Sequence, residues 1–152
     1  MQTTQQSGTA FQKPSGFERV MNRLVGSMVS AGIGPRYMRL LEVRGRKSGK
    51  LYATPVNVLE SGGKLWLVAP RGRTQWSLNV EQSGELALRR GGQLERYKIR
   101  ITEPSERPLL LKQYLDTYVS QVQRYFDVRA GSPVDAFAPV AERYPVYELI
   151  AA

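Results

Sequence analysis

The sequence predicts an α+β fold in which about six mostly antiparallel strands form a small, partly open β-barrel with helices at its periphery. Strand-length apolar segments that follow one another across short glycine turns indicate an antiparallel meander and a separate hairpin. Segments with a helical period lie before, between and after these strands. The expected strands are 37–44, 51–59, 64–70, 85–90, 94–102 and 144–150.

Tight turns connect the strands of both groups. Residues 45–49 join the first strand to the second, and Ser61-Gly62-Gly63 joins the second to the third. Gly91-Gly92 separates the two strands of the later hairpin. Paired glycines are a good signal for a two-residue hairpin turn, since glycine adopts positive φ without steric cost.

The first expected helix begins at Ser15, which forms a capping box with Glu18. Apolar residues then recur every three or four positions up to Val29 and give one apolar stripe. Three further helices are expected: a short one over 75–81, a long one over 108–127, and a short one from Ser132-Pro133 through Val140. The candidate core residues of the long helix are Leu109, Leu111, Tyr114, Leu115, Tyr118, Val122 and Phe126.

The 152 residues are expected to form a flexible polar tail, 1–14, followed by a single domain, 15–152. The tail lacks the apolar region of a secretory signal, and no apolar run approaches the roughly 20 residues of a membrane span. We therefore expect a cytoplasmic protein. Peripheral contact with the inner face of the membrane stays open.

The chain contains no cysteine and no histidine. It therefore lacks the side chains of Cys- and His-based metal sites, a thiol nucleophile, and the general base of a Ser-His-Asp triad. Functions that need these groups are excluded, and no metal site is expected.

The net charge of +9 is unevenly distributed along the chain. Residues 1–100 carry 17 basic and 6 acidic side chains, whereas residues 101–152 carry 5 basic and 7 acidic ones. A one-sided positive surface predicts an anionic partner: nucleic acid, a phosphorylated or polycarboxylate small molecule, or an acidic membrane. Arg96, Lys98 and Arg100 alternate along one strand without stacking aromatics on the same face, so no nucleic acid is expected there.

The strongest local motif is Gly45-Arg46-Lys47-Ser48-Gly49. Its two glycines permit a tight turn whose backbone N–H groups converge on an anion, and its three central side chains add further donors. It lacks the glycine spacing and the following helix of a P-loop. On its own, the motif favours a hairpin turn that carries solubilising charges over an anion site.

The order of motifs around this loop resembles the deazaflavin-dependent nitroreductase family. The loop is followed by Thr54-Pro55, by Gly63 before an apolar strand, by Arg71-Gly72, and by Trp76 with Asn79 on a short helix. The resemblance covers roughly residues 37–102. It implies a split β-barrel, similar to FMN-binding split barrels, that binds coenzyme F420; FMN is the less expected cofactor.

The resemblance also implies roles for particular residues. The 45–49 loop would hold the phosphate and oligoglutamate tail of F420, and Tyr125 is carried over as the candidate catalytic residue of the substrate pocket. The family carries arginine where this chain has Tyr52, and the helix that begins at Trp76 lacks the usual second aromatic residue and histidine. The candidate cofactor-binding residues are Gly45, Arg46, Lys47, Ser48, Gly49, Thr54, Pro55, Val56, Ala69, Pro70, Arg71, Gly72, Trp76 and Asn79.

The expected function is therefore an F420-dependent oxidoreductase that transfers a hydride to a small electrophile: a quinone, an enone or a nitro compound. Hydride transfer from a deazaflavin needs orientation and exclusion of water, and a chain without histidine or cysteine provides both. The alternative is a non-catalytic split barrel that binds a lipid, a fatty acid or the cofactor itself. An exposed barrel edge would also favour a homodimer.

Overall fold

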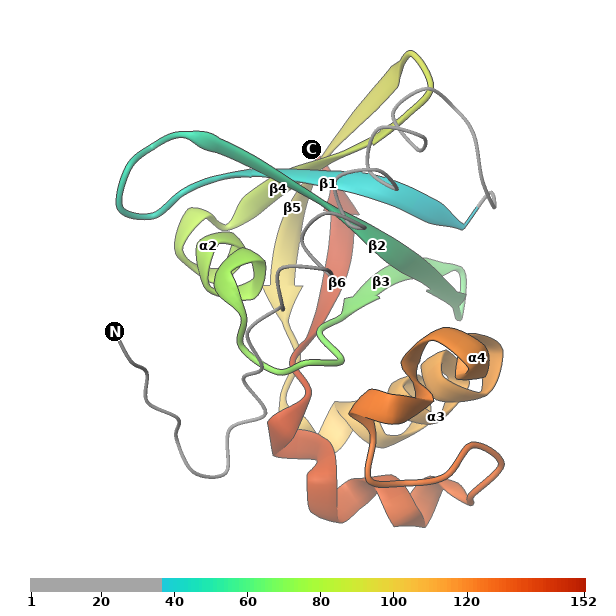
Figure 1. Cartoon of the computed structure of the whole chain (residues 1–152). Helices are drawn as coiled ribbons and strands as arrows, with labels where there is room; N and C mark the ends of the chain where they lie inside the picture. The colour runs from blue at the N-terminus through green and yellow to red at the C-terminus, as the bar shows by residue number, and fades with distance from the viewer. Residues whose placement is uncertain (1–36) are drawn as a thin grey trace.

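The computed structural model describes residues 37–152, so the expected tail and the first expected helix lie outside the described residues. Six strands form one antiparallel barrel in the order β1-β2-β3-β6-β5-β4 (Figure 1). The strands are β1 (Met38–Arg44), β2 (Leu51–Ser61), β3 (Lys64–Val68), β4 (Glu85–Arg90), β5 (Gln93–Ile101) and β6 (Val146–Ala151).

The predicted meander and hairpin are both confirmed. β1 pairs with β2 from Met38 opposite Asn57 to Arg44 opposite Leu51, and β2 continues into β3 across a turn at Gly62 and Gly63. β4 and β5 pair across Gly91-Gly92. Local turn chemistry thus accounts for all three hairpins.

The prediction of a partly open barrel was wrong, because the sheet closes on itself. β1 pairs with β4 as well as with β2, and β6 lies between β3 and β5 and pairs with both. These pairings join segments that are distant in the sequence, and turn signals do not report such contacts. Closure leaves neither side of β1 as a free edge, which removes the edge-based argument for a homodimer.

The short helix predicted over 75–81 is confirmed as α2 (Gln75–Ser83), which ends at Gly84 with a positive φ of 78°. It lies against one side of the barrel, where it contacts β1 and β4 (Figure 1). Ser77, Asn79 and Val80 form its buried face. Among the described residues 37–152, no helix has the length and apolar character of a membrane span.

The single helix predicted over 108–127 was wrong. The segment divides into α3 (Arg107–Thr117), α4 (Val119–Val122) and the 3₁₀ turn η2 (Gln123–Tyr125), with a break at Tyr118, whose φ and ψ are −113° and 33°. The Tyr118 hydroxyl donates to the Val58 carbonyl at 2.5 Å, and its ring packs against Tyr37 and Tyr114 at centroid distances of 4.7 and 5.2 Å. These contacts to β2 and to the start of β1 favour the non-helical backbone at Tyr118.

Two details of the predicted helices also differ. Leu109 is 51% exposed, whereas its neighbour Leu110 is 7% exposed and takes the core position. The last predicted helix is the 3₁₀ helix η3 (Val134–Arg143), preceded by Pro133 as its N-cap, with Pro139 inside it. Pro139 has no N–H for an α-helical hydrogen bond, which is consistent with the tighter 3₁₀ form. A further 3₁₀ turn, η1 (Pro104–Glu106), precedes α3.

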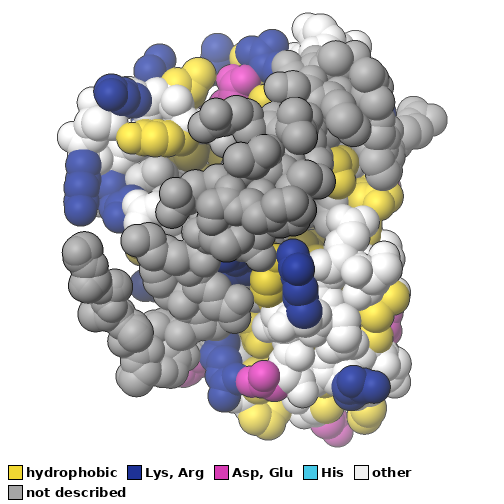
Figure 2. All heavy atoms as spheres, in the orientation of Figure 1, with side chains coloured by type: hydrophobic (Ala, Val, Ile, Leu, Met, Phe, Trp, Pro, Cys, Tyr) yellow, Lys and Arg dark blue, Asp and Glu magenta, His cyan; other side chains and the backbone are white. Residues whose placement is uncertain are grey.

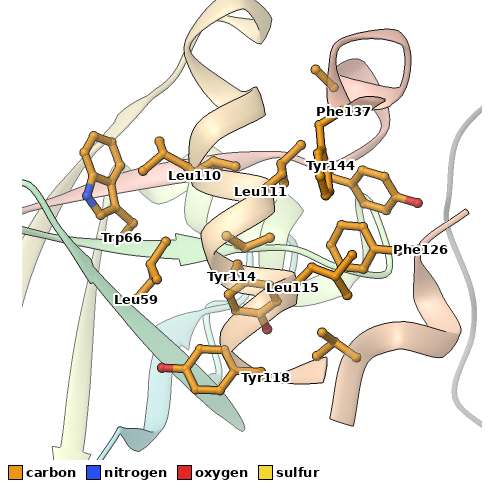
Figure 3. Packing of buried hydrophobic residues seen from close by; sticks show 14 of the residues in the cluster. Leu59, Trp66, Leu110, Leu111, Tyr114, Leu115, Tyr118, Phe126, Phe137 and Tyr144 are labelled. Atoms are coloured by element: carbon orange, nitrogen blue, oxygen red, sulfur yellow. The ribbon is translucent and has the colours of Figure 1, made fainter. Parts of the chain in front are cut away.

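The buried residues form two clusters. One fills the barrel around Leu41, Leu67 and Tyr147. The other lies between the lower end of the barrel and the layer formed by α3, α4 and η3, where Leu111, Leu115 and stacked Phe126 and Tyr144 pack together (Figure 3). The helical layer is thereby fixed below the barrel, and the candidate site lies where it meets the strands and α2.

Candidate functional site

A cavity of about 950 Å³ lies between the β1–β2 hairpin, α2, the end of β3 and the α4–η2 segment. Its size is within the range of small-molecule and cofactor sites. One part of the wall is the turn 45–48 with the face of α2 that carries Trp76 and Asn79. Another part is formed by Arg71 after β3 and by residues 120–122, 124 and 125.

The 45–49 turn is a compact loop stabilised by its own backbone. The Gly45 N–H donates to the Lys50 carbonyl at 2.7 Å, and the Gly49 N–H donates to the Gly45 carbonyl at 3.0 Å. A Cβ added at Gly45 would lie 2.5 Å from Cε2 of Tyr52, so the close approach of this ring favours glycine. Gly49 has a φ of 75°, the left-handed conformation that glycine adopts most easily.

Arg46 is held over α2 by two side-chain acceptors. Oδ1 of Asn79 accepts from the Arg46 backbone N–H at 3.0 Å and from its Nη1 at 2.8 Å. Nη1 also donates to Oε1 of Gln75 at 3.0 Å. Among the described residues, the remaining donors of this guanidinium have no hydrogen-bond partner, and neither of its two hydrogen bonds is to a carboxylate. The positive charge of Arg46 is therefore retained at the cavity.

Lys47 and Ser48 complete the rim of the cavity at this turn. The Ser48 hydroxyl accepts from the Lys50 backbone N–H at 3.1 Å and lies 3.4 Å from the Tyr52 hydroxyl. Lys and Arg side chains gather over the β1–β2 turn, at the upper left of the face in Figure 2. The side chains that the hairpin contributes there are Arg44, Arg46, Lys47 and Lys50.

A buried polar network supports α2 from inside the barrel. The Tyr147 hydroxyl hydrogen-bonds with Ser77 and donates to Oε2 of Glu81 at 2.7 Å, and its ring meets Trp76 edge-on at 6.0 Å. Burial raises the pKa of Tyr147 far above its ordinary value, so the hydroxyl stays protonated. Tyr147 therefore fixes the helix that places Trp76 and Asn79 in the cavity wall.

In the wall of the cavity, Tyr125 lies beside two cationic side chains. The guanidinium carbons of Arg124 and Arg71 lie 4.8 and 5.5 Å from the centre of its ring. Nη2 of Arg124 donates to the Tyr125 hydroxyl at 2.7 Å, and the Tyr144 hydroxyl donates to the Tyr125 carbonyl at 3.0 Å. Both the backbone and the phenol of Tyr125 are thus positioned.

A further part of the wall combines β2 with the helical layer. Asn57 donates to Oε1 of Gln121 at 2.9 Å, and Gln121 donates to the Tyr37 hydroxyl at 2.8 Å. Tyr114 also lines this part, and burial raises its pKa well above the ordinary value of a tyrosine. The region presents apolar surface and neutral polar groups.

Most of the residues singled out from the sequence line this one cavity, and three do not. Ala69 is buried and donates its N–H to the Pro145 carbonyl, and the Gly72 N–H donates to the Ala69 carbonyl. At Gly49, no atom lies within 4 Å of the position that a Cβ would take. These three shape the backbone next to the cavity. The lining residues from the predicted set are Gly45, Arg46, Lys47, Ser48, Thr54, Pro55, Val56, Pro70, Arg71, Trp76, Asn79 and Tyr125.

Several lining residues were not predicted. They include Arg124, next to the predicted Tyr125, and Thr74, the residue before α2. The buried hydroxyl oxygen of Thr74 has no hydrogen-bond partner among the described residues. The threonine directly before a predicted helix was a signal for a polar group at this position. For Arg124, the only indication in the sequence was its position next to Tyr125, which had been predicted to lie at the site.

Comparison with known proteins decides the family. The family model described as F420H(2)-dependent quinone reductase matches residues 17–134 of the chain. The chain belongs to this family. It is therefore an F420-dependent oxidoreductase, and the expectation of an F420 enzyme drawn from the sequence is confirmed. No curated protein matches the chain significantly.

Solved structures confirm the split-barrel fold. A structure of an F420-H2 dependent reductase (FDR-A) shares 23% identity over 75% of this chain and 94% of its own, with a TM-score of 0.51. A structure described as a domain-swapped dimer shares 21% identity over 88% of this chain and 92% of its own, with a TM-score of 0.53. A putative pyridoxamine 5'-phosphate oxidase from Listeria innocua shares 10% identity over 76% of this chain and 84% of its own, with a TM-score of 0.50. At these identities the likeness concerns the fold.

The donor set of the cavity fits the cofactor of the quinone reductase family. F420 carries a phosphodiester and glutamate carboxylates, and the described residues that line the cavity include four cations and no acidic side chain. Those cations are Arg46, Lys47, Arg71 and Arg124. Cationic side chains with backbone N–H groups at a glycine turn are suited to such anions.

Proposed function

We propose that this F420-dependent oxidoreductase reduces a quinone, and that the cavity holds the cofactor with its anionic tail at the 45–48 turn. The observation that carries the proposal is the Arg46-Lys47-Ser48 rim on a cavity whose described lining residues include no carboxylate. In this arrangement Arg46, Lys47 and Ser48 bind the phosphate. Trp76, Val56 and Pro55 offer flat and apolar surface to the deazaflavin ring.

The protein's own contribution is binding, orientation and exclusion of water. Reduced F420 supplies a hydride when bound. Reduction of a quinone to the hydroquinone takes up one hydride and one proton, and the chain has no histidine or cysteine to supply that proton. The Tyr125 hydroxyl is the candidate donor of a hydrogen bond to the quinone oxygen. The oxygen of this hydroxyl accepts from Nη2 of Arg124, which leaves its O–H to donate to the substrate.

Cofactor binding is tested by titration with F420 and with FMN at matched concentrations, followed by tryptophan fluorescence. Trp76 lines the cavity and Trp66 is buried outside it, so a Trp76→Phe variant identifies the signal that comes from the site. We expect saturable quenching with F420 at a lower Kd than with FMN. Equal or tighter binding of FMN would contradict the cofactor assignment.

Turnover is tested with F420H2 and three acceptor classes: a naphthoquinone, a cyclic enone and a nitroaromatic compound. The oxidation of F420H2 is followed by its absorbance under anaerobic conditions. We expect the highest kcat/KM for the quinone. Tight binding of F420 without oxidation by any acceptor would instead favour a cofactor-binding protein without catalysis.

We also propose that the β1–β2 hairpin contacts a membrane surface from which a lipid-soluble quinone is reached. Leu51 is 53% exposed, and Arg44 and Lys50 lie beside it on the same hairpin. Exposed apolar side chains flanked by cations suit an anionic bilayer. Co-sedimentation with anionic and with zwitterionic vesicles tests this: we expect binding to the anionic ones, weakened in Leu51→Ser.

A homodimer is our proposal for the assembly state. Its support is the fold likeness to a protein whose solved structure is a domain-swapped dimer. Sedimentation velocity of the full chain at two concentrations distinguishes the dimer from a monomer.

A further inference from the structure

Asn57 is a buried polar residue in the cavity wall, and only one end of its amide is hydrogen-bonded. The residue is 9% exposed and lines the cavity. Its Nδ2 donates to Oε1 of Gln121 at 2.9 Å. Its Oδ1 is buried and accepts no hydrogen bond from the residues in the range 37–152. Because a buried carbonyl oxygen without a donor is destabilising, such an atom in a cavity wall indicates a ligand that donates to it.

Two neighbours determine which end of the Asn57 amide is used. Gln121 donates through Nε2 to the Tyr37 hydroxyl at 2.8 Å, so Oε1 is the atom of Gln121 that faces Asn57. Burial raises the pKa of Tyr114, and a hydrogen bond with Asn57 opposes this effect. A hydrogen bond that lowers the pKa of a phenol is one donated to its oxygen. Both neighbours therefore engage the amino group of Asn57, and its carbonyl oxygen is available to a ligand.

The side chain of Asn57 lies on the face of β2 that meets the helical layer. Because side chains alternate along a strand, Asn57 shares this face with Leu59, which packs in the cluster below the barrel, whereas Val56 packs against the cluster inside it. Gln121 lies in α4, four residues before Tyr125. The Asn57 oxygen therefore belongs to the part of the wall whose tyrosine is proposed to contact the quinone, and not to the turn proposed to bind the phosphate.

We propose that Asn57 accepts a hydrogen bond from an uncharged hydroxyl group of the substrate, so that the preferred acceptor is a quinone with a hydroxyl-bearing side chain. Asn57 is then a specificity-determining residue, and Gln121 is the positioning residue that holds its amide. A plain quinone carries only acceptor oxygens and leaves the Asn57 oxygen unpaired. A site built to pair with a hydroxyl group rejects the analogue that lacks it for this reason. The inference rests on the proposed function for the reaction, and on the unpaired oxygen for the choice of substrate.

The test compares three 1,4-naphthoquinones that differ in the group at C2. The hydroxymethyl compound donates a hydrogen bond. The methoxymethyl ether has a similar electronic effect on the ring but no O–H, and the ethyl compound has the size of the alcohol without its oxygen. With F420H2 as the reductant, we expect kcat/KM for the alcohol to be about tenfold that for either reference compound. A value for the ether or the ethyl compound equal to that for the alcohol would overturn the proposal.

Asn57→Leu removes the acceptor oxygen at a similar side-chain volume. The ratio of kcat/KM for the alcohol to that for the ethyl compound should be about tenfold lower in this variant than in the wild type. Any difference in reduction potential between the two quinones cancels, because the same pair is used with both proteins. An unchanged ratio in Asn57→Leu would overturn the proposal, and the comparison of the three quinones in the wild type does not depend on the folding of the variant.

Gln113→Leu is the matched control. Oε1 of Gln113 accepts from the Ser61 hydroxyl at 2.5 Å, so this amide also joins the helical layer to β2, but it does not line the cavity. The variant should retain the wild-type ratio. A fall in Gln113→Leu as large as that in Asn57→Leu would assign the effect to the packing of the helical layer and overturn the proposal.

Calorimetric titration of the three quinones into the protein loaded with oxidised F420 measures binding without turnover. If F420H2 reduces none of the quinones, the proposed function fails, whereas tighter binding of the alcohol that is lost in Asn57→Leu still supports the hydroxyl site. Equal Kd values for the three quinones would overturn the inference even if all of them are reduced. The deazaflavin ring also carries an N–H group, so F420 alone is titrated into Asn57→Leu. A loss of F420 affinity as large as the loss for the alcohol would assign the oxygen to the cofactor and overturn the choice of substrate.

Discussion

The side-chain oxygen of Asn79 accepts hydrogen bonds from the backbone N–H and from Nη1 of Arg46, at 3.0 and 2.8 Å. Asn79 lies on α2 and is 4% exposed, and the two residues are 33 positions apart in the sequence. One buried acceptor thus fixes both the backbone and the charged end of the residue proposed to bind the cofactor phosphate. The placement of the glycine turn over the cavity therefore depends on α2.

Asn79→Ala is expected to weaken F420 binding and to lower the free energy of unfolding. Removing the acceptor leaves the Arg46 N–H without its partner, and losing such a bond costs about 1–3 kcal/mol. Gln75→Ala is the control, since it removes the other, exposed contact of Arg46 and leaves the buried one. Thermal unfolding and F420 titration of both variants check this; equal effects of the two substitutions would contradict a special role for Asn79.

Arg46→Ala and Lys47→Ala are each expected to weaken F420 binding by about 1–3 kcal/mol, as for a lost charged hydrogen bond. Lys47 is exposed, so its substitution should leave the melting temperature unchanged. The matched ligand is the deazaflavin riboside that lacks the phosphate and glutamates. Its affinity should be the same in wild type and variants, and a similar loss for both ligands would assign the two residues to the ring instead of the tail.

The hairpins of the fold were predictable because their information is local. Gly91-Gly92 and Gly62-Gly63 specify turns, and the flanking segments have strand character. Closure through the β1–β4 pair and the insertion of β6 between β3 and β5 depend on segments far apart in the chain. The break at Tyr118 has the same origin, because its hydroxyl reaches Val58 on β2, 60 positions away.

The candidate site was predictable where ordered motifs marked it and less so where the helical layer contributes. The glycine turn, Thr54-Pro55 and Trp76 line one cavity. Arg124 was not singled out, because an arginine on an exposed helix end is ordinarily a solvated charge. Its contact with the Tyr125 ring depends on the folded geometry, which no spacing rule encodes.

Stability should fall in acid through the network around Arg100. Hydrogen bonds from Arg100 and from the Glu103 N–H lower the pKa of Glu106 to about 2, and Arg100 also lowers the pKa of Glu148. These carboxyl groups bind protons less readily in the folded state than in the unfolded state. Their contribution to the free energy of unfolding is therefore complete above their ordinary pKa of 4.5. The stabilisation that Glu106 contributes is lost as the pH falls from 4.5 towards 2.

Circular dichroism melts between pH 7 and pH 2 measure this loss. The melting temperature of the wild type should fall more steeply below pH 4.5 than that of Glu106→Gln, which has no carboxyl group to protonate at this position. Glu142→Gln, at an exposed glutamate of η3, should retain the wild-type slope. Parallel slopes for wild type and Glu106→Gln would show that this ion pair does not contribute to the acid sensitivity.

The pH dependence of turnover should follow the cofactor and not the protein. The chain has no histidine and no cysteine, and tyrosine and lysine side chains ordinarily titrate near pH 10. Between pH 5 and 8 the profile of kcat for the naphthoquinone should therefore match the titration of free F420H2. Tyr125→Phe should lower kcat about a hundredfold, the lower end of the effect of a positioned proton donor, without changing the shape of the profile. An inflection that free F420H2 does not share would assign the proton to a protein group, and an unchanged kcat in Tyr125→Phe would remove this tyrosine from the mechanism.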